Sequence, residues 1–418
     1  MYFKDLTHYL QMLEQRKDLH RISAQVDPIL EITEIADRIV KQGGPALLFE
    51  KPAGARFPLA INLFGSPERT CFALGVERLD EVAERITGMI PASPLTTFTD
   101  KLKLLWSLKD LKNIQPKTIR TAPSQQVVDL EPNLGDLPVM QCWPDDAGRF
   151  ITLPLVFTRN PDTGMQNAGM YRMQVIDENR AFMHWHLHHD GAVHHRLWAE
   201  QGRDTEVAVA LGGDPASIYA ATAPLPPGLD EMLFAGFLRN NPVEMVKAKT
   251  VDLLVPAHAE FILEGTVSAS NTMLEGPFGD HTGFYSDADQ YPVFTLRAIT
   301  RKSDPVYPAT NVGRPPMEDY FLGKATERFF LPLIKLQLPE ILDINFPAEG
   351  VFHNCVLVSI RKQYPGHARK IASALWGMGQ MMFTKMIVVF DADVDVQDCS
   401  QAAWIAFSNV DPERDLFY

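Results

Sequence analysis

The segment GMYRMQVI spans residues 169–176, the turn DEN follows at 177–179, and AFMHWHLH spans residues 181–188. Alternating apolar and polar residues on both sides of a short polar turn predict a β-hairpin. In the second strand, His184, His186 and His188 would share one face, while the apolar residues between them would face a core. We therefore expect a sheet with one polar face in the middle of the chain.

The hairpin would bring residues from its two ends together. Pairing across the turn places His188 beside Gly169, close enough to Asn167 for the two side chains to share a ligand. Strict alternation would put Arg172 on the opposite face from Asn167. A bulge near Gly169 is therefore needed if Asn167 and Arg172 serve one site.

The histidines leave three interpretations open. A zinc site of three histidines lacks the usual ligand spacings, because the sequence has neither Cys-x-x-Cys nor His-Glu-x-x-His. A solvated or hydrogen-bonded histidine face is the simpler alternative. The third interpretation combines one histidine with oxygen ligands: Asn167, His188 and a distant Glu would suit Mg²⁺ or Mn²⁺ that also holds a phosphate.

A second segment, EGPFGD from Glu275 to Asp280, carries two carboxylates around residues that resist regular structure. Gly276 and Gly279 allow backbone angles closed to other residues, and Pro277 biases Gly276 away from the helical region. The segment can therefore fold back and bring its two acids together. Two carboxylates that share a site tend to keep one proton at neutral pH, which suits a general acid. The simpler alternative is a polar surface loop.

Several blocks of the chain resemble a known family. QNAGMYR at 166–172, EGPFGDHTGFY at 275–285 and RKQYPGHA at 361–368 are similar to the UbiD-type decarboxylases, which use prenylated FMN. Further similar blocks stand in the same order along nearly the whole chain, including NLFG at 62–65 and GRPP at 313–316. Within the family, Asp280 followed by His-Thr-Gly resembles the polyprenyl-hydroxybenzoate branch more than the cinnamate branch.

The resemblance implies roles for individual residues. It implies a site for Mn²⁺ or Mg²⁺, with K⁺ as a further candidate, that bridges protein and cofactor phosphate at Asn167, His188 and Glu231. It implies a catalytic group of Arg172, Glu275 and Asp280. It implies contacts to prenylated FMN from Met170, Tyr171, Arg172, His184, Trp185, His186, His189 and Lys385. Without the resemblance, Glu231 would be interpreted as a helix-start acid and Lys385 as a solvated surface lysine.

The implied chemistry gives these residue types a purpose. Loss of CO₂ leaves an electron pair on the ring carbon, and the cofactor supplies an electron sink. Asp280 would then return a proton to that carbon. Burial is expected to raise the pKa of Asp280, so that this carboxyl is partly protonated at neutral pH.

Some features depart from the family pattern. His184 and His189 stand where many members carry Arg, so contacts to the flavin phosphate would be weaker or pH-dependent. Typical relatives continue for several tens of residues past the position of Tyr418, in a segment associated with site closure and subunit assembly. We expect slow turnover for this form, and a homo-oligomer that is a dimer or hexamer.

Composition excludes other classes of function. The chain has 418 residues, with 39 Lys and Arg against 52 Asp and Glu and a formal charge of −13. No basic tract predicts nucleic-acid binding. No run approaches the roughly 18 apolar residues that span a bilayer, so membrane contact would be at most peripheral. Four cysteines without motif spacing fit a reducing, cytoplasmic compartment.

The expected fold is a multidomain protein of the α+β and α/β classes. Residues 1–120 would form an N-terminal α/β domain, residues 121–310 a flavin-binding domain like a split β-barrel, and residues 311–418 a C-terminal α/β domain.

Local patterns place some elements within these domains. Apolar periodicity predicts helices at 9–16 and 28–41, the second capped by Asp27. A hairpin is expected from 294–300 to 306–307. Farther along, strands at 355–360 and 386–390 around a helix at 366–378 predict a strand–helix–strand unit.

These observations together predict an enzyme. We expect non-oxidative, reversible decarboxylation of an aromatic or α,β-unsaturated acid. Polyprenyl-4-hydroxybenzoate of ubiquinone biosynthesis is the first candidate substrate, and other aromatic or heteroaromatic acids are alternatives. A flavin prenyltransferase would supply the cofactor. Two other classes stay open: a metallohydrolase that uses the histidine face, and a flavin-binding scaffold without activity.

Overall fold

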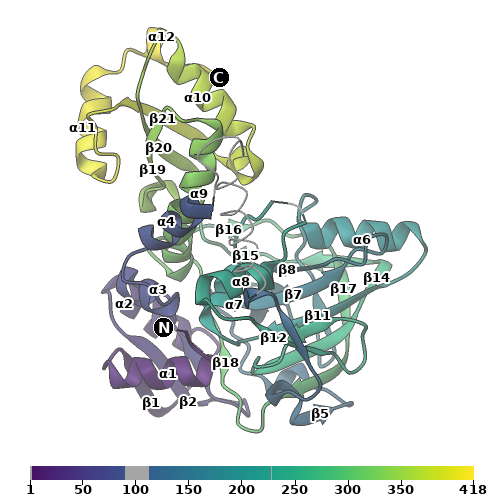
Figure 1. Cartoon of the computed structure of the whole chain (residues 1–418). Helices are drawn as coiled ribbons and strands as arrows, with labels where there is room; N and C mark the ends of the chain where they lie inside the picture. Colours follow the sequence, from purple (N-terminus) through teal and green to yellow (C-terminus); the bar gives the residue numbers. More distant parts are fainter. Residues whose placement is uncertain (1, 90–112, 227) are drawn as a thin grey trace.

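The computed structural model describes residues 2–89, 113–226 and 228–418. Its first unit is a sheet with the order β1 (Leu19–Val26), β2 (Ala46–Pro52), β3 (Leu59–Ile61) and β18 (Tyr307–Pro308) (Figure 1). The helices of this part of the chain are α1 (Leu6–Gln15), α2 (Glu31–Lys41), α3 (Pro67–Ala73) and α4 (Asp80–Met89). Because β18 comes from far along the chain, it ties the N-terminal sheet to the later residues.

Helix α2 shows how the local sequence sets an element. Ile32 and Ala36 lie four residues apart and are fully buried, so one face of the helix packs inward. The helix begins at Glu31, later than predicted. The side chain of Asp27 accepts a hydrogen bond from the backbone N–H of Ile29 and closes a turn there instead of capping the helix.

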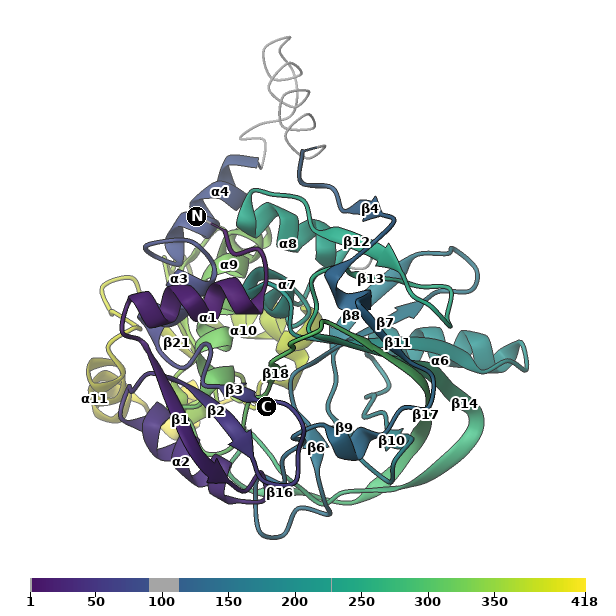
Figure 2. The same ribbon diagram turned by 90° about the horizontal axis from the view of Figure 1, so that it is seen from below.

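The central sheet is antiparallel. Its order is β10 (Arg180–Phe182), β17 (Asp289–Arg301), β14 (Phe261–Glu275), β11 (Thr205–Leu211), β7 (Pro154–Arg159) and β8 (Gln166–Met170), with β5 (Val127–Asp129) on β17. Its long strands curve around the interior of the molecule (Figure 2). Within the described residues, no pairing of named strands joins β8 to β10, and Ala181 of β10 forms a further antiparallel bridge with Val175.

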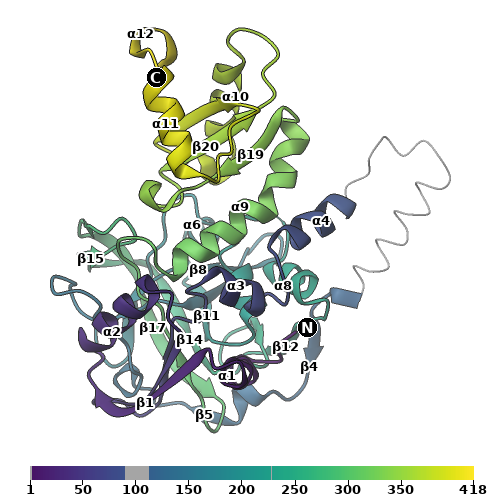
Figure 3. The same ribbon diagram turned by 90° about the vertical axis from the view of Figure 1, so that its left-hand side faces the viewer.

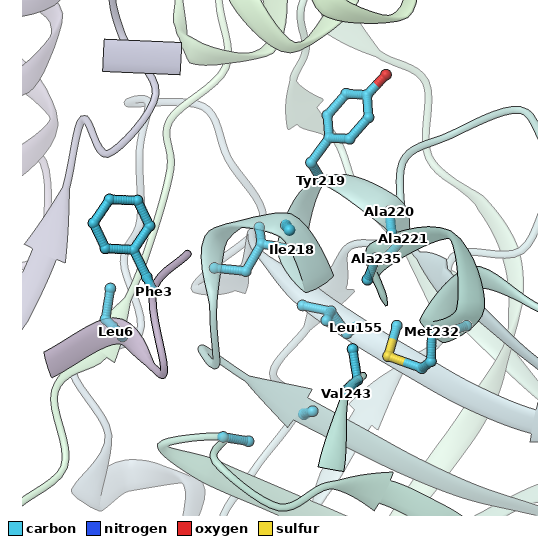
Figure 4. Close-up of a cluster of buried hydrophobic side chains, with 14 of the residues drawn as sticks. Phe3, Leu6, Leu155, Ile218, Tyr219, Ala220, Ala221, Met232, Ala235 and Val243 are labelled. Carbon is cyan, nitrogen blue, oxygen red and sulfur yellow. The ribbon is translucent and has the colours of Figure 1, made fainter. Parts of the chain in front are cut away.

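Strand β11 separates two apolar cores. Its alternate residues Ala208 and Ala210 face one core, and Val207 and Val209 face the other. Figure 4 shows part of the first core, where Leu155 of β7 lies among side chains of α7 (Pro215–Ala220) and α8 (Glu231–Arg239). Each fully buried aliphatic side chain contributes about 1.5–3 kcal/mol. This packing therefore fixes α8 against the sheet.

A third unit follows helix α9 (Glu318–Gln337), which runs from the main body toward it (Figure 3). Its sheet has the order β19 (Ile341–Asn345), β20 (Cys355–Ile360) and β21 (Met386–Asp391). Helix α10 (His367–Trp376) connects the parallel strands β20 and β21, so the predicted strand–helix–strand unit is confirmed. Helices α11 (Cys399–Asn409) and α12 (Pro412–Asp415) come last.

Smaller elements complete the described residues. One sheet has the order β13 (Leu254–Pro256), β12 (Glu244–Lys247) and β4 (Lys117–Ile119). Two strand pairs are β6 (Phe150–Ile151) with β9 (Met173–Gln174), and β15 (Phe278–Gly279) with β16 (Tyr285–Ser286). Helix α6 (Asp190–Glu200) follows the histidine-rich segment.

Of the two predicted hairpins, the one at 169–188 is formed only near its turn and the one at 294–307 is wrong in its pairing. The first arm of the 169–188 hairpin divides between β8, which pairs with β7, and β9, which pairs with β6. The returning strand ends at Phe182. The two arms still meet, because Val175 and Ala181 form an antiparallel bridge and the backbone N–H groups of Ile176 and His184 donate to the carbonyls of Arg180 and Arg172 at 2.9 and 3.3 Å. The strand β18 pairs with β3 instead of returning along β17, so there a partner distant in the sequence replaces the local one.

The predicted fold class, a mixed α/β multidomain protein, is confirmed. The domain boundaries at 120/121 and 310/311 stay predictions. Among the described residues, no helix combines the length and the apolar character needed to cross a membrane.

Candidate functional site

Arg172, Glu275 and Asp280 form an ion-pair group that we call the acid–arginine cluster. The guanidinium Nε of Arg172 lies 3.1 Å from Glu275 Oε1, and Nη1 lies 3.1 Å from Asp280 Oδ2. Its third nitrogen, Nη2, donates to Ser286 Oγ at 3.3 Å. Such a planar fork of donors fixes both carboxylates at once. The structure thus brings together the three predicted catalytic residues.

The backbone explains how the two acids converge. Glu275 ends β14, and Asp280 follows the short strand β15 after a turn at Gly276. Gly276 has a φ of +89°, a conformation that glycine adopts without strain. On the other side, the chain leaves β8 after Met170, so that Arg172 lies between β8 and β9 and its guanidinium stacks 4.4 Å from the centre of the Phe278 ring. The folded-back loop expected from the sequence is therefore present.

His184 extends the acid–arginine cluster. Its Nδ1 lies 2.5 Å from Glu275 Oε2, and the Glu275 side chain is fully buried. Its Nε2 lies 2.9 Å from His186 Nε2, and its ring stacks on Tyr291 at 4.2 Å. Glu275 is thus held between Arg172 and His184.

The remaining histidines cluster on an irregular segment instead of a strand face. One nitrogen of each of His186, His188 and His189 lies within 4.8 Å of the others, so the three could hold a transition metal. Burial, followed by the neighbouring histidines, lowers the pKa of His186 to about 4 and that of His189 to about 3. However, His189 Nδ1 already accepts the backbone N–H of His186 at 3.2 Å. A metal bound to Nε2 of His189 would require the ring proton to be on Nδ1, and Nδ1 could then no longer accept this hydrogen bond.

Asn167 and Glu231 form a second group, which we call the oxygen site. Asn167 Nδ2 donates to Glu231 Oε1 at 2.7 Å, and the backbone N–H of Ala168 donates to Oε2 at 2.9 Å. Glu231 is the first residue of α8, directly after Asp230, whose side chain caps the helix. A pocket of about 260 Å³ adjoins both residues.

The oxygen site fits a hard cation. Asn167 Oδ1 is buried and has no hydrogen-bond partner among the described residues. Burial raises the pKa of Glu231 to about 7, and no cationic side chain of the described residues is among the groups that shift it. A divalent cation would supply the missing positive charge and a partner for Asn167 Oδ1. His188 is not among the hydrogen-bond partners of Asn167 or Glu231 in the described chain; its ring lies 4.7 Å from that of Phe383.

The predicted cofactor-binding residues lie in two places. Met170, Tyr171 and Trp185 are next to the acid–arginine cluster in the chain, and the buried indole Nε1 of Trp185 has no hydrogen-bond partner among the described residues. A buried donor of this kind is what an oxygen-rich ligand would satisfy. Lys385 is exposed and precedes β21 in the third unit, where its charge acts on His353.

Sequence reasoning missed the histidine that follows Asp280. His281 Nδ1 lies 2.6 Å from Asp280 Oδ1. Burial alone would raise the pKa of Asp280, but the hydrogen bond and charge of His281, together with Arg172, hold it well below its usual range. The expected partly protonated Asp280 is therefore not found. The signal was present in the sequence, because an adjacent imidazole can pair with the carboxyl.

Comparison with known proteins identifies the family of the chain. Family models for 3-octaprenyl-4-hydroxybenzoate carboxy-lyase match three stretches: the N-terminal domain at residues 10–86, the Rift-related domain at 117–315 and the C-terminal domain at 320–418. An uncharacterized protein of Archaeoglobus fulgidus is 50% identical over 100% of this chain and 86% of its own length. An uncharacterized protein of Aquifex aeolicus is 48% identical over 99% of this chain and 86% of its own length.

Solved structures give the same result. The UbiD-class enzyme HmfF of Pelotomaculum thermopropionicum, in an evolved dimeric form with prFMN, superimposes with a TM-score of 0.85 at 27% identity, covering 99% of this chain and 92% of that one. The vanillic acid decarboxylase of Sedimentibacter hydroxybenzoicus in its closed form gives a TM-score of 0.86 at 27% identity, covering 99% and 86%. The resemblance stated from the sequence is thus confirmed, and the chain belongs to the UbiD family.

Proposed function

We propose that this protein is a carboxy-lyase that removes CO₂ from an aromatic or α,β-unsaturated carboxylic acid with prenylated FMN as cofactor. The observation that carries the proposal is the acid–arginine cluster, in which one buried guanidinium holds two carboxylates. Membership of the UbiD family supports it, as do two neighbours, one determined with prFMN and one named a vanillic acid decarboxylase.

The oxygen site has a place in this proposal. Asn167 and Glu231 would hold Mn²⁺ or Mg²⁺, and the cation would neutralise the cofactor phosphate. His188 would complete the ligand set by leaving the side of Phe383. K⁺ is a further candidate ion for the same region.

Arg172 and Asp280 of the acid–arginine cluster each have a task. The bound cofactor supplies an electron sink for the pair left behind when CO₂ departs. Arg172 orients the substrate carboxylate or its two acid partners through its fork of donors. Asp280 returns the proton to the carbon that has lost CO₂. Tyr171, Trp185 and the neighbouring histidines would line the flavin, and Lys385 would reach it from the third unit.

The proposed substrate and partners can be tested in one preparation. The full chain should be coexpressed with a flavin prenyltransferase, which we propose as the supplier of the cofactor. CO₂ release is then measured with vanillic acid, 3,4-dihydroxybenzoic acid and a polyprenyl-4-hydroxybenzoate, the substrate expected for ubiquinone biosynthesis. Turnover of any of these acids only after coexpression supports the proposal, whereas flavin-loaded protein inert toward all three argues for a scaffold. Sizing the same preparation tests for the proposed dimer or hexamer.

A metallohydrolase is the second candidate, because His186, His188 and His189 approach one another. It predicts hydrolysis that needs Zn²⁺ and no flavin. The hydrogen bond already made by His189 Nδ1 disfavours it. Hydrolysis of an ester by flavin-free protein, lost in His186→Ala, would reverse the preference.

A further inference from the structure

Decarboxylation needs a proton in every turnover. A carboxylate leaves as CO₂, the electron pair of the broken C–C bond stays on carbon, and a new C–H bond takes one proton from the medium. The proposed function, on which this inference rests, gives the last transfer to Asp280. Asp280 must then regain a proton before the next turnover, so a route from solvent to this carboxylate is required.

His281 has the geometry of such a route. Its Nδ1 lies 2.6 Å from Asp280 Oδ1, while Arg172 occupies the other carboxylate oxygen at 3.1 Å. The side chain of His281 is 33% exposed and that of Asp280 is 21% exposed, so the imidazole is the more accessible of the two. We propose that His281 is the residue that reloads Asp280 with a proton and holds its carboxyl in place.

Other groups around His281 shape its charge. Asp280 faces it directly, and Asp319 of α9 is a second acidic neighbour. Burial raises the pKa of Asp319 to about 7, so this carboxyl is only partly charged at neutral pH. Arg172 and His353 are the basic neighbours, and the His353 ring lies 4.8 Å away. Burial lowers the pKa of His353 to about 4, so at neutral pH it adds no positive charge.

The pKa values of the pair agree with the geometry. Burial would lower the pKa of His281, but the hydrogen bond and charge of Asp280 raise it above its ordinary value. The same contact lowers the pKa of Asp280. The pair therefore stores one proton on the imidazole and an anion on the carboxyl.

The proposed step balances in protons and electrons. The cycle starts with an anionic Asp280 and a protonated His281. The Nδ1–H proton of His281 moves to Asp280 Oδ1, which leaves a neutral imidazole. When the carbon takes this proton, the Asp280 O–H bond breaks and its electron pair stays on oxygen. Solvent then reprotonates the partly exposed imidazole. The enzyme returns to its starting state having consumed one proton and released one CO₂.

The pairing can be tested without activity. In the full chain purified from cells that lack flavin prenyltransferase, the Cε1–H NMR signal of His281 is titrated. We expect a midpoint above 6.5, the ordinary value, that falls in Asp280→Asn. The matched control is His258, whose Nε2 lies 2.7 Å from Glu244 Oε2. This pair is separate from the acid–arginine cluster, so its titration should not respond to Asp280→Asn. A His281 midpoint that Asp280→Asn leaves unchanged would overturn the pairing, whatever the enzyme acts on.

The reloading role needs a second measurement on flavin-loaded protein. With vanillic acid as probe, His281→Gln should keep its flavin but lose about tenfold or more in solvent-deuterium incorporation and in turnover. The rate of wild type should fall as the pH rises above the His281 midpoint, and this pH dependence should be absent in His281→Gln. Added imidazole should restore part of the rate in His281→Ala, and His258→Gln should behave as wild type.

The outcomes separate this inference from the proposed function. If wild type turns over the probe and His281→Gln matches it in rate and pH profile, reloading through His281 is wrong while decarboxylation stands. If wild type releases no CO₂ from any aromatic acid, the proposed function fails, and the NMR titration still decides whether His281 and Asp280 share a proton.

Discussion

The acid–arginine cluster and the oxygen site each bury a carboxylate, but they differ in the groups that pair with it. In the acid–arginine cluster, Glu275 accepts from Arg172 and from His184, and its side chain is fully buried. In the oxygen site, Glu231 accepts only from an amide and a backbone N–H, and no cationic side chain pairs with it among the described residues.

The difference identifies which group is complete in the polypeptide alone. Buried ion pairs fix geometry when their hydrogen bonds are satisfied, and the acid–arginine cluster meets this condition. The oxygen site leaves a buried carboxyl without a counter-charge and an amide oxygen without a donor. We infer that the first is preorganised by the protein, while the second becomes organised when a cation binds.

The largest expected effect follows from removing the shared guanidinium. Arg172→Ala should lower the free energy of unfolding by roughly 3–5 kcal/mol, because it leaves Glu275 buried without its main partner. The control is Arg180→Ala, which breaks an exposed pair with Asp177 and should leave the free energy of unfolding nearly unchanged. Urea denaturation measures both. Equal costs for the two variants would show that the acid–arginine cluster is not preorganised by Arg172.

Asp280→Asn separates positioning from proton transfer within the same cluster. The amide keeps the shape of the side chain but cannot supply a proton, so turnover should fall by roughly 10²-fold or more while metal and flavin stay bound. Asp287→Asn is the control, since Asp287 lies exposed in the same loop region. Solvent-deuterium exchange into the product is the measurement. An unchanged exchange rate would reduce Asp280 to a loop-stabilising residue.

The contribution of the oxygen site to the free energy of unfolding should depend on bound metal more than on the charge of Glu231 alone. In the metal-free chain, Glu231→Gln should cost less than about 1 kcal/mol, because a flipped Asn167 can pair with the new amide. Mn²⁺ at a hundred times its Kd should stabilise wild type by about 2.7 kcal/mol and the variant hardly at all. Thermal unfolding with and without Mn²⁺ tests this. Comparable stabilisation of both proteins would place the metal elsewhere, with the histidines at 186–189 as the next candidate.

Sequence reasoning predicted the convergence of Glu275 and Asp280 because its signal is local, whereas Arg172 joined the group only through the family resemblance. Gly276 and the flanking Pro277 predict a loop that folds back. In the structure, Glu275 and Asp280 converge on Arg172. The same reasoning failed for the charge state of Asp280, since a carboxyl's pKa depends on every nearby hydrogen bond and not on burial alone. His281 reverses the expected direction.

The hairpin at 169–188 is shorter than predicted for a different reason. Its alternation was correct for a strand, but sheet pairing is decided by partners far along the chain. Strand β10 pairs with β17 and strand β8 with β7, so the histidines after Phe182 are released into an irregular segment. The predicted proximity of His188 to Asn167 depended on that hairpin and does not appear among the hydrogen bonds of the oxygen site.

The smallest expected effect is the pH dependence that the Asp280–His281 pair gives to stability. The pKa of Asp280 is lowered from 3.8, so its contribution is present above about pH 4 and is lost as pH falls toward the folded-state value. The pKa of His281 is raised from 6.5, so its contribution is complete below 6.5 and is lost as pH rises through the folded-state value. The stability difference between wild type and His281→Gln should therefore be greatest between about pH 4 and 6.5.

Partial exposure and salt limit this difference to about 1 kcal/mol or less. Urea unfolding at pH 5.5 and pH 8.5, at low and high salt, measures it. A difference that is larger at pH 8.5 would mean that the imidazole stabilises the loop by packing, and that the pair does not hold a shared proton.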